Sequence, residues 1–291
     1  MMSMTKTGIP DVTRTREKSR GILPKHWYAH LILLVAVAII GFPLFYALLV
    51  STQSNFEVIR YQFWPGTALR ENWEFMMNQL GLWRFMINSF FIAVAVALGK
   101  VVFSLFAGLG LVYFRYPGKW LVFGFIILTL MTPTEVLAIA LFRLVNNFNW
   151  ADTYAALTVP FFASATSVFL FRQHFRSIPS ELSEAAQLDG ATPLQFLFRV
   201  LIPLSWSTIG AIVVIMFLDT WNQYLWPLLI IRSTEQQVIQ VGVAKALTEI
   251  QNSQEYGPLM LGAVLSSLPP LIVFLLLQKQ FMKGFALTRD K

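Results

Sequence analysis

The chain contains several apolar runs that are long enough to cross a lipid bilayer, which takes about 20 predominantly apolar residues as an α-helix. The predicted spans are residues 28–50, 85–113, 120–142, 154–171, 204–231 and 259–278. Only 13% of the 291 residues are charged, whereas an ordinary soluble domain is about one quarter charged. We therefore predict an all-α polytopic membrane protein with six transmembrane helices.

Composition argues against several kinds of site. Cysteine is absent, so the chain has neither disulfides nor thiolate metal ligands. The three histidines, His26, His30 and His174, do not cluster at metal-ligand spacing. An intramembrane enzyme needs a nucleophile with a base, or a metal, at membrane depth, and the chain has no membrane-centred histidine. We predict no metal site and no catalytic residue.

The basic residues lie beside the apolar runs, which predicts membrane topology and no nucleic-acid partner. One side of the predicted spans holds most of them: Lys6, Arg14, Arg16, Lys18, Arg20, Lys25, Arg115, Lys119, Arg172, Arg176, Arg199, Lys279, Lys283, Arg289 and Lys291. The other side holds Arg60, Arg70, Arg84, Arg143, Arg232 and Lys245. Because cytoplasmic loops carry an excess of Lys and Arg, both termini are predicted to be cytoplasmic.

This topology predicts a simple domain organisation. Residues 1–25 form a cytoplasmic tail, and no apolar core of signal-peptide type precedes the first span, so that span is an uncleaved anchor. Residues 26–291 form one six-helix transmembrane domain, in which residues 52–84 are an external loop. Residues 176–203 form a cytoplasmic loop.

A polar segment within this cytoplasmic loop predicts two short helices joined at a glycine. Ser180 is the predicted N-cap of the first helix, with Glu181 in its first turn. Gly190 is the residue type that ends such a helix in a left-handed conformation. The segment is therefore predicted to form a compact knob between two spans.

The second helix of the knob begins immediately after this glycine. Thr192, Pro193 and Gln195 are the predicted N-cap, N1 proline and N3 amide of a capping box. The following apolar residues have helical spacing and are predicted to hold the knob to the transmembrane bundle: Leu194, Leu197, Phe198 and Leu201.

The same segment resembles the EAA loop of the membrane-spanning subunits of ATP-binding-cassette (ABC) importers. It contains Glu184-Ala185-Ala186, then Gly190, then Val200-x-Ile202-Pro203 in place of the family's I-x-L-P. The two departures exchange one apolar residue for another. In that family the loop is a coupling helix that docks on a cytoplasmic ATPase. The resemblance therefore implies these coupling residues: Glu184, Ala185, Ala186, Asp189, Gly190 and Pro203.

Other stretches extend the resemblance from about Trp27 to the C-terminus. Residues 114–119, FRYPGK, are similar to a turn of the carbohydrate-importer permeases. The permeases of glycerol-3-phosphate importers are similar at more places: residues 98–100, 130–136, 163–166, 169–173 and 221–227. The resemblance implies the MetI-like fold of type I importers and a place in the bacterial inner membrane.

The energy source is expected to be a separate protein, because the chain has no G-x(4)-G-K-[ST] phosphate loop. No cofactor is therefore predicted in this chain, and ATP and Mg²⁺ would bind the partner ATPase. The resemblance implies a second permease subunit, two ATPase subunits and an extracytoplasmic substrate-binding protein, all around a non-catalytic transport subunit in the lipid bilayer.

Polar residues inside the predicted spans are candidates for the substrate path, because ionisable groups are costly at membrane depth. They are Lys100, Glu135, Asp219, Asn222 and Gln223. Lys100, near the middle of its span, offers a cation to an anionic substrate. Alternatively, Lys100 pairs with Glu135 to hold two helices together, or extends toward the membrane interface.

The sequence leaves more than one possibility open for the cargo and for the class of transporter. The first hypothesis is import of glycerol-3-phosphate or a glycerophosphodiester, and the second keeps the same machine for a neutral sugar of the maltose or trehalose type. An ion-driven secondary transporter is a third possibility. That class predicts inverted repeats and paired intramembrane carboxylates, neither of which the sequence contains, and it leaves the EAA-like segment unexplained.

Overall fold

The computed structural model describes residues 27–245 and 255–286, without the side chains of residues 134, 135, 281 and 283–286. The predicted tail, residues 1–25, lies outside the described residues. The chain divides into two units, which meet after Phe45. Every regular element within the described residues is helical, so the predicted all-α class is confirmed.

The helix bounds place one long helix in each of several predicted spans. The N-terminal half contains α1 (Trp27–Val50), α2 (Asn55–Ile59), α3 (Leu69–Glu74), the π-helix η1 (Phe75–Gln79), α4 (Leu82–Tyr113), α5 (Lys119–Leu130) and α6 (Thr134–Asn147). The C-terminal half contains α7 (Tyr154–Thr158), the 3-10 helix η2 (Val159–Phe161), α8 (Ala165–Ser177), α9 (Ser180–Leu188), α10 (Pro193–Phe196), the π-helix η3 (Leu197–Leu201), α11 (Ile202–Leu204), α12 (Trp206–Trp221), α13 (Leu225–Ile230), the 3-10 helix η4 (Thr234–Gln236) and α15 (Tyr256–Ala286).

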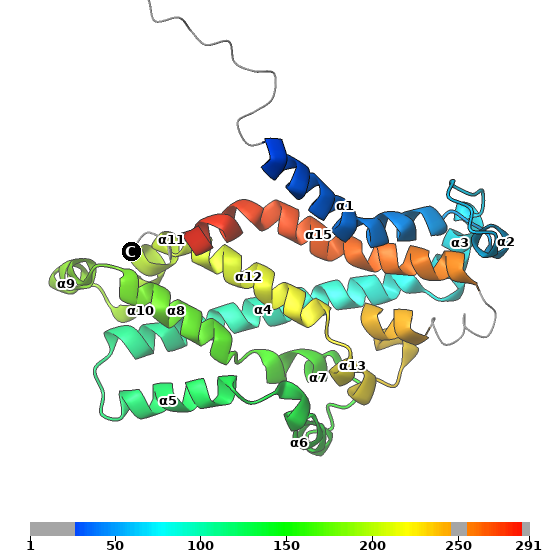
Figure 1. Ribbon diagram of the computed structural model, residues 1–291. Coiled ribbons are helices and arrows are strands. Elements are labelled where there is room, and N and C mark those ends of the chain that lie inside the picture. Colours follow the sequence, from blue (N-terminus) through cyan, green and yellow to red (C-terminus); the bar gives the residue numbers. More distant parts are fainter. Residues whose placement is uncertain (1–26, 246–254, 287–291) are drawn as a thin grey trace, which may run out of the picture. The chain divides into compact units, whose positions relative to one another are not determined.

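The core of the second unit is a row of packed helices in which α4 lies between α8 and α12, and α12 lies against α15 (Figure 1). Its most deeply buried large side chains are aromatic, namely Phe171 and Phe175 of α8 and Phe217 and Trp221 of α12. The rings of Phe217 and Trp221 stack with centroids 5.7 Å apart. In contrast, none of the side chains of α5 is fully buried.

Four stretches of the described chain are long and apolar enough to cross a membrane, namely α1, α4, Tyr154–Ser177 and Tyr256–Gln280. They correspond to the first, second, fourth and sixth predicted spans. A fifth candidate pairs α12 with the helix before it, Pro193–Leu204, across a bend of 81°. The bend falls beside Pro203, whose ring and missing N–H oppose a continuous helix.

Two predicted spans are not continuous helices. The third, residues 120–142, is divided between α5 and α6, because Pro133 adopts an extended N-cap conformation and lacks the N–H that would continue the first helix. The fifth, residues 204–231, is interrupted between α12 and α13. Pro227 cannot donate to the carbonyl four residues earlier, which favours a break at that turn.

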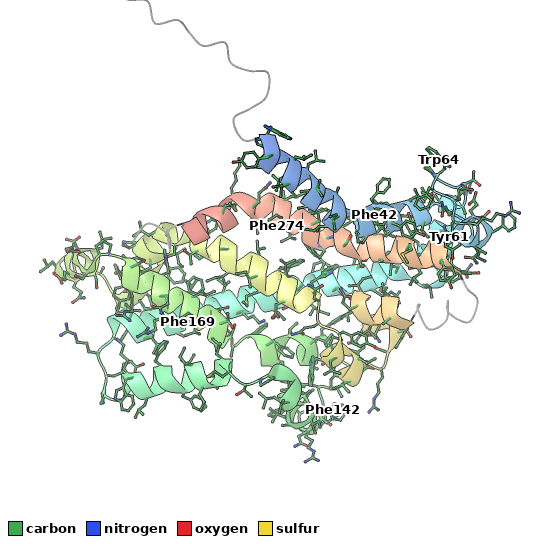
Figure 2. All side chains as sticks on the ribbon, viewed as in Figure 1. Phe42, Tyr61, Trp64, Phe142, Phe169 and Phe274 are labelled. Carbon is green, nitrogen blue, oxygen red and sulfur yellow. The ribbon has the colours of Figure 1, made fainter. Side chains whose placement is uncertain are left out.

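The segment between α1 and α4 is folded by side-chain bonds to backbone carbonyls. Asn72 donates to the carbonyls of Ser51 and Gln53, and Gln53 in turn donates to those of Gln62 and Trp64, all within 3.1 Å. Tyr61 and Trp64 project outward from it (Figure 2) and are about four-fifths exposed. The predicted external loop is therefore an ordered structure with an aromatic surface.

Glycine 99 allows close packing between α4 and η2, which gives a first prediction. A Cβ at Gly99 would overlap the ring of Phe162, whereas one at Gly110, on the same helix, meets nothing within 4 Å. We expect Gly99→Ala to destabilise the subunit by about 1–3 kcal/mol through overpacking. Gly110→Ala should be neutral or stabilising, since alanine is the better helix former. Thermal unfolding of the purified complex measures both, and equal effects would contradict this packing.

Candidate functional site

The first helix of the predicted knob, α9, begins one residue earlier than predicted. Its N-cap is Pro179, without a side-chain capping bond, and Ser180 is the first helical residue. The prediction that Ser180 is the N-cap is therefore wrong. Pro179 holds the extended conformation of a helix boundary (φ −55°, ψ 136°), which its ring favours.

The glycine turn that ends α9 is confirmed and has the bonds of a Schellman motif. Gly190 is left-handed, with φ +72°. Its N–H donates to the carbonyl of Gln187 at 3.1 Å, and the N–H of Ala191 donates to the carbonyl of Ala186 at 2.9 Å. These bonds satisfy two carbonyls at the helix end. The turn that joins the two helices of the knob is therefore closed by its own backbone.

The capping box that begins α10 is also confirmed. The Thr192 hydroxyl accepts from the Gln195 amide at 3.3 Å, and the Gln195 side chain accepts from the Thr192 amide at 2.8 Å. Pro193 occupies the first turn. The knob thus has defined helix ends on both sides of Gly190.

The apolar row that attaches the knob to the bundle differs from the predicted one. Leu197 and Leu201 are buried as predicted, but Leu194 and Phe198 are 53% and 58% exposed. Phe196 is buried instead, with its ring edge-on to that of Tyr113 at 5.1 Å. The reason is the π-helical turn η3, Leu197–Leu201, which adds a residue to the turn and rotates the buried face.

The outer face of α9 is exposed. Glu184 and Ala185 are exposed, and Leu188 is 89% exposed. Glu184 has no ion pair or side-chain hydrogen bond to any described residue. Ala186 alone of the three EAA residues packs against the core. The knob therefore presents a carboxylate beside small and apolar side chains, a surface suited to a protein partner.

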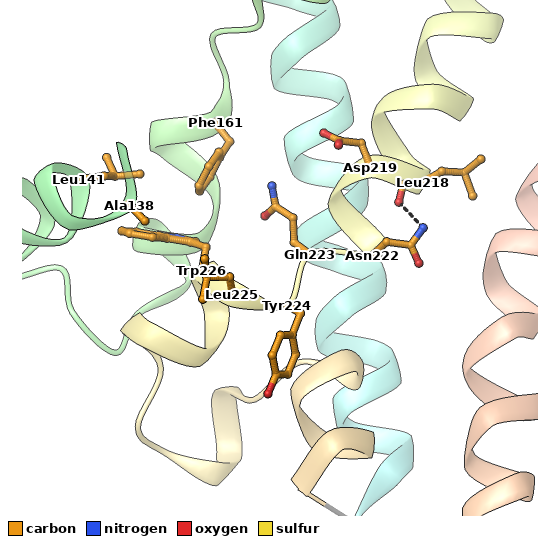
Figure 3. A pocket seen from close by; sticks show the side chains of 10 residues that line it. All are labelled: Ala138, Leu141, Phe161, Leu218, Asp219, Asn222, Gln223, Tyr224, Leu225 and Trp226. Atoms are coloured by element: carbon orange, nitrogen blue, oxygen red, sulfur yellow. Dashed lines mark hydrogen bonds between the residues drawn. The ribbon is translucent and has the colours of Figure 1, made fainter. Parts of the chain in front are cut away.

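Three of the predicted path residues, Asp219, Asn222 and Gln223, line one cavity of about 580 Å³ (Figure 3). They come from the end of α12 and the break that follows it. The Asn222 side chain turns back and donates to the Leu218 carbonyl at 2.9 Å. The side chains of Asp219 and Gln223 make no such bond to a backbone carbonyl of this wall.

Lys100 is tied to this cavity through an ion pair. Its ammonium donates to a carboxylate oxygen of Asp219 at 2.9 Å, across α4 and α12. The Lys100 side chain is 8% exposed, whereas that of Asp219 is 57% exposed. Among the described side chains the partner is Asp219. The Glu135 side chain, the partner that the sequence suggested, lies outside the described residues, so that pairing stays a prediction. The carboxylate that pairs with the buried Lys100 ammonium therefore also lines the cavity.

The remaining wall of the cavity is mostly apolar. It was not identified from the sequence, because only polar residues within the spans were candidates. It comprises Ala138, Leu141, Phe161, Leu218, Tyr224, Leu225 and Trp226. Trp226 is buried and donates from its indole to the Ala156 carbonyl at 3.0 Å. The family-like run of residues 221–227 was the available signal, because it contains both the polar and the aromatic lining.

Asp152 fixes the far end of α13, and this gives a second prediction. One of its carboxylate oxygens accepts from the amides of Arg232 and Ser233, both at 3.0 Å, and from the Ser233 hydroxyl at 2.9 Å. We expect Asp152→Ala to speed trypsin cleavage after Arg232 about tenfold, because two backbone bonds are lost. Asp152→Asn should do less, since its amide oxygen still accepts and asparagine tolerates the left-handed φ of +58°. Cleavage after Arg143 is the internal control.

The pH dependence of this clamp follows from the same bonds. The backbone bond from Ser233 contributes most to lowering the pKa of Asp152, burial opposes it, and the bonds from Arg232 and the Ser233 hydroxyl add to it. Because the folded-state pKa is below the ordinary value of about 3.9, the clamp's stabilisation is complete above that pH. It is lost only as pH falls through the lower folded-state value.

Comparisons with known proteins point to one family. A family model described as "Binding-protein-dependent transport system inner membrane component" matches residues 100–286. The sn-glycerol-3-phosphate transport system permease protein UgpE of Rhizobium meliloti (strain 1021) is 38% identical over 268 residues, which cover 89% of this chain and 95% of the relative. UgpE of Escherichia coli O6:K15:H31 (strain 536) is 37% identical over 265 residues, which cover 88% of this chain and 94% of the relative.

Solved structures share the fold. A chain of a bacterial ABC transporter involved in the import of the acidic polysaccharide alginate superposes with a TM-score of 0.74 at 22% identity, covering 87% of this chain and 95% of that chain. A chain of a bacterial alginate ABC transporter in complex with a pentasaccharide-bound periplasmic protein gives a TM-score of 0.58 at 15% identity, with 86% and 92% covered. These likenesses concern the arrangement of the helices.

Proposed function

The chain belongs to the family of binding-protein-dependent transport system inner membrane components, and from this premise we propose that it is the permease subunit of an ABC importer for glycerol-3-phosphate or a glycerophosphodiester. The observation that carries the cargo is the 38% identity to a glycerol-3-phosphate permease over 89% of the chain. Membership in this family leaves the ion-driven transporter and the intramembrane enzyme without support.

The cavity beside α12 supports an anionic cargo. Lys100 supplies the cation, Asp219 holds it in the empty state, and Gln223 offers amide hydrogens to substrate oxygens. A phosphate group bonds well to an ammonium, because charge-assisted hydrogen bonds are about twice as strong as neutral ones. In this proposal Lys100, Asp219, Asn222 and Gln223 belong to the translocation path, and Glu135, on the neighbouring α6, joins them.

The knob supports coupling to a separate ATPase. In the proposed mechanism, closure of an ATPase dimer displaces α9, and the Schellman turn and capping box carry the shift to the helices that follow. Glu184 pairs across the interface, Ala185 allows close approach, and Ala186 joins the helix to the core. Asp189, Gly190 and Pro203 keep the turn and the bend in place.

The proposed topology keeps six crossings and both termini in the cytoplasm. The third crossing consists of α5 and α6 together, and the fifth of α12 and α13, each broken beside a proline. Broken helices are tolerated at membrane depth where the free backbone groups line a cavity. The cavity at the α12–α13 break supports this reading, and the distribution of Lys and Arg supports the orientation.

The proposed complex contains other chains that perform the steps this subunit does not. They are a second permease subunit, two ATPase subunits that bind ATP and Mg²⁺, and an extracytoplasmic binding protein that delivers substrate. The related alginate transporter forms a complex with a periplasmic protein. The ordered aromatic segment between α1 and α4 is the proposed delivery surface.

ATP hydrolysis by the reconstituted complex, with its binding protein, tests this function. We expect stimulation by glycerol-3-phosphate or glycerophosphocholine and none by maltose. Stimulation by maltose alone would favour the neutral-sugar alternative and remove the role of Lys100. No stimulation by either class, in a complex that hydrolyses ATP, would contradict both cargoes.

A further inference from the structure

A cluster of basic side chains at the turn between α4 and α5 has no role in the proposed path. Arg115 lies in this turn, Lys119 begins α5, and Arg172 and Arg176 lie one helical turn apart on α8. Residues four apart on a helix share a face. None of the four forms an ion pair with a described residue. The cluster is therefore uncompensated positive charge.

The members of the cluster are close enough to repel one another. Burial lowers the pKa of the Lys119 ammonium, and the positive charges of Arg172 and Arg115 lower it further. Lys119 is held there by bonds to the carbonyls of Val112 and Phe114, at 3.0 and 2.9 Å. Like charges gathered in this way cost free energy unless an anion binds among them.

One donor of the cluster is buried without a partner. The Arg172 guanidinium lies over the Phe123 ring of α5, 3.7 Å from its centroid, and its Nε has no hydrogen-bond partner among the described residues. Buried donors are almost always bonded, so an unpaired guanidinium N–H marks a place for an acceptor that the chain itself does not supply. Stacking on Phe123 orients the planar group for such an acceptor.

An apolar groove begins at the same turn. Its volume is about 700 Å³, and Phe114 and Tyr116, which flank Arg115, are part of its lining. The others are Phe106, Leu109, Gly110, Thr192, Pro193 and Leu194. Beside it, Trp120 is 75% exposed at the start of α5, a position typical of the membrane interface. Charge and apolar surface thus meet on one turn.

We propose that this turn binds an anionic phospholipid, with the headgroup phosphate among Arg115, Lys119, Arg172 and Arg176 and an acyl chain along the groove. The four cations and the unpaired guanidinium N–H match the charge and acceptors of a phosphodiester. The groove distinguishes a lipid from a free phosphate, because only a lipid brings an apolar chain. This site is separate from the cavity beside α12.

Native mass spectrometry of the purified complex, exchanged into mixed phosphatidylglycerol and phosphatidylcholine, tests the charge. Arg115 and Arg176 are exposed, so Arg115→Gln/Arg176→Gln should fold normally. We expect it to lower the retained ratio of phosphatidylglycerol to phosphatidylcholine about 25-fold, since each basic residue contributes about fivefold. The control removes two exposed charges elsewhere, Arg199→Gln/Lys279→Gln, and should leave the ratio unchanged.

The groove is tested with a pair of glycines that have room for a side chain. A Cβ at Gly110 or at Gly124 meets nothing within 4 Å. Gly110→Leu fills the groove and should reduce retained phosphatidylglycerol several-fold, whereas Gly124→Leu, on the surface of α5, should not. Displacement by millimolar glycerol-3-phosphate or inorganic phosphate, with no effect of Gly110→Leu, would identify a soluble phosphate as the ligand and overturn the lipid site. Equal retention of both lipids by the wild type would overturn it as well.

Discussion

Glu184→Lys is expected to lower substrate-stimulated ATP hydrolysis by the reconstituted complex about 100-fold, while the subunit remains in the membrane at its normal level. The side chain is exposed and touches no described residue through an ion pair or hydrogen bond, so the exchange costs the subunit little stability. At an interface built for a carboxylate, the reversed charge opposes docking, and such a mismatch costs several kcal/mol. Basal hydrolysis by the ATPase subunits should persist.

A matched control separates the position from the charge. Glu181→Lys makes the same change of charge on the same helix, one turn earlier, where the side chain is also exposed. We expect it to retain most of the stimulated activity, apart from a small loss of helix stability at the N-terminus. If both variants lose coupling equally, the net charge of the knob matters and the assignment of Glu184 fails. Normal coupled transport by Glu184→Lys would remove α9 as the coupling helix.

The Lys100–Asp219 pair should respond unequally to the loss of its two members. Asp219→Asn leaves a cation that is 8% exposed without a counter-ion, whereas Lys100→Met leaves a carboxylate that already faces the cavity. We therefore expect Asp219→Asn to destabilise the complex by about 3 kcal/mol, the lower end of the range for breaking a buried pair. Lys100→Met should cost less, because its apolar stem is kept.

Transport should be impaired more by Lys100→Met than by Asp219→Asn, the reverse of their order in stability. Lys100→Met removes a charge-assisted bond to the substrate, worth about 1.5–3 kcal/mol, which corresponds to about 10- to 150-fold in stimulation by glycerol-3-phosphate. Thermal unfolding and ATP hydrolysis measured on both variants decide the matter. A larger loss of stability in Lys100→Met than in Asp219→Asn would mean that the pair is only a structural tie. Unchanged stimulation in Lys100→Met would exclude this lysine from the path.

The helix ends of the knob were largely predictable from the sequence. Gly190 and the Thr192–Gln195 capping box were identified because few residue types satisfy a left-handed turn or an orphan amide, and those requirements are local. The attachment of the knob was not predicted fully, because helical spacing assumes 3.6 residues per turn. The π-turn at Leu197–Leu201 changes this spacing, and no residue type marks such a turn.

The cavity shows a second limit of prediction from the sequence. Lys100, Asp219 and Gln223 were recognised singly, because polar groups are conspicuous in apolar runs. The pairing of Lys100 with Asp219 was not predicted, because these residues are 119 positions apart and meet only through the packing of α4 against α12. Pro133 is a visible helix breaker within the third predicted span, but the sequence did not show that α5 packs against α8.

The Lys100–Asp219 ion pair also affects how far the transport cycle depends on the membrane potential. Lys100 and Asp219 carry opposite unit charges, so this ion pair adds no net charge to the membrane interior. Moving one elementary charge through the membrane potential takes about 2.3 kcal/mol per 100 mV. A lone ammonium at this depth would make the return of the empty complex depend on that potential. With the pair intact, these two residues together make that return no more dependent on the potential.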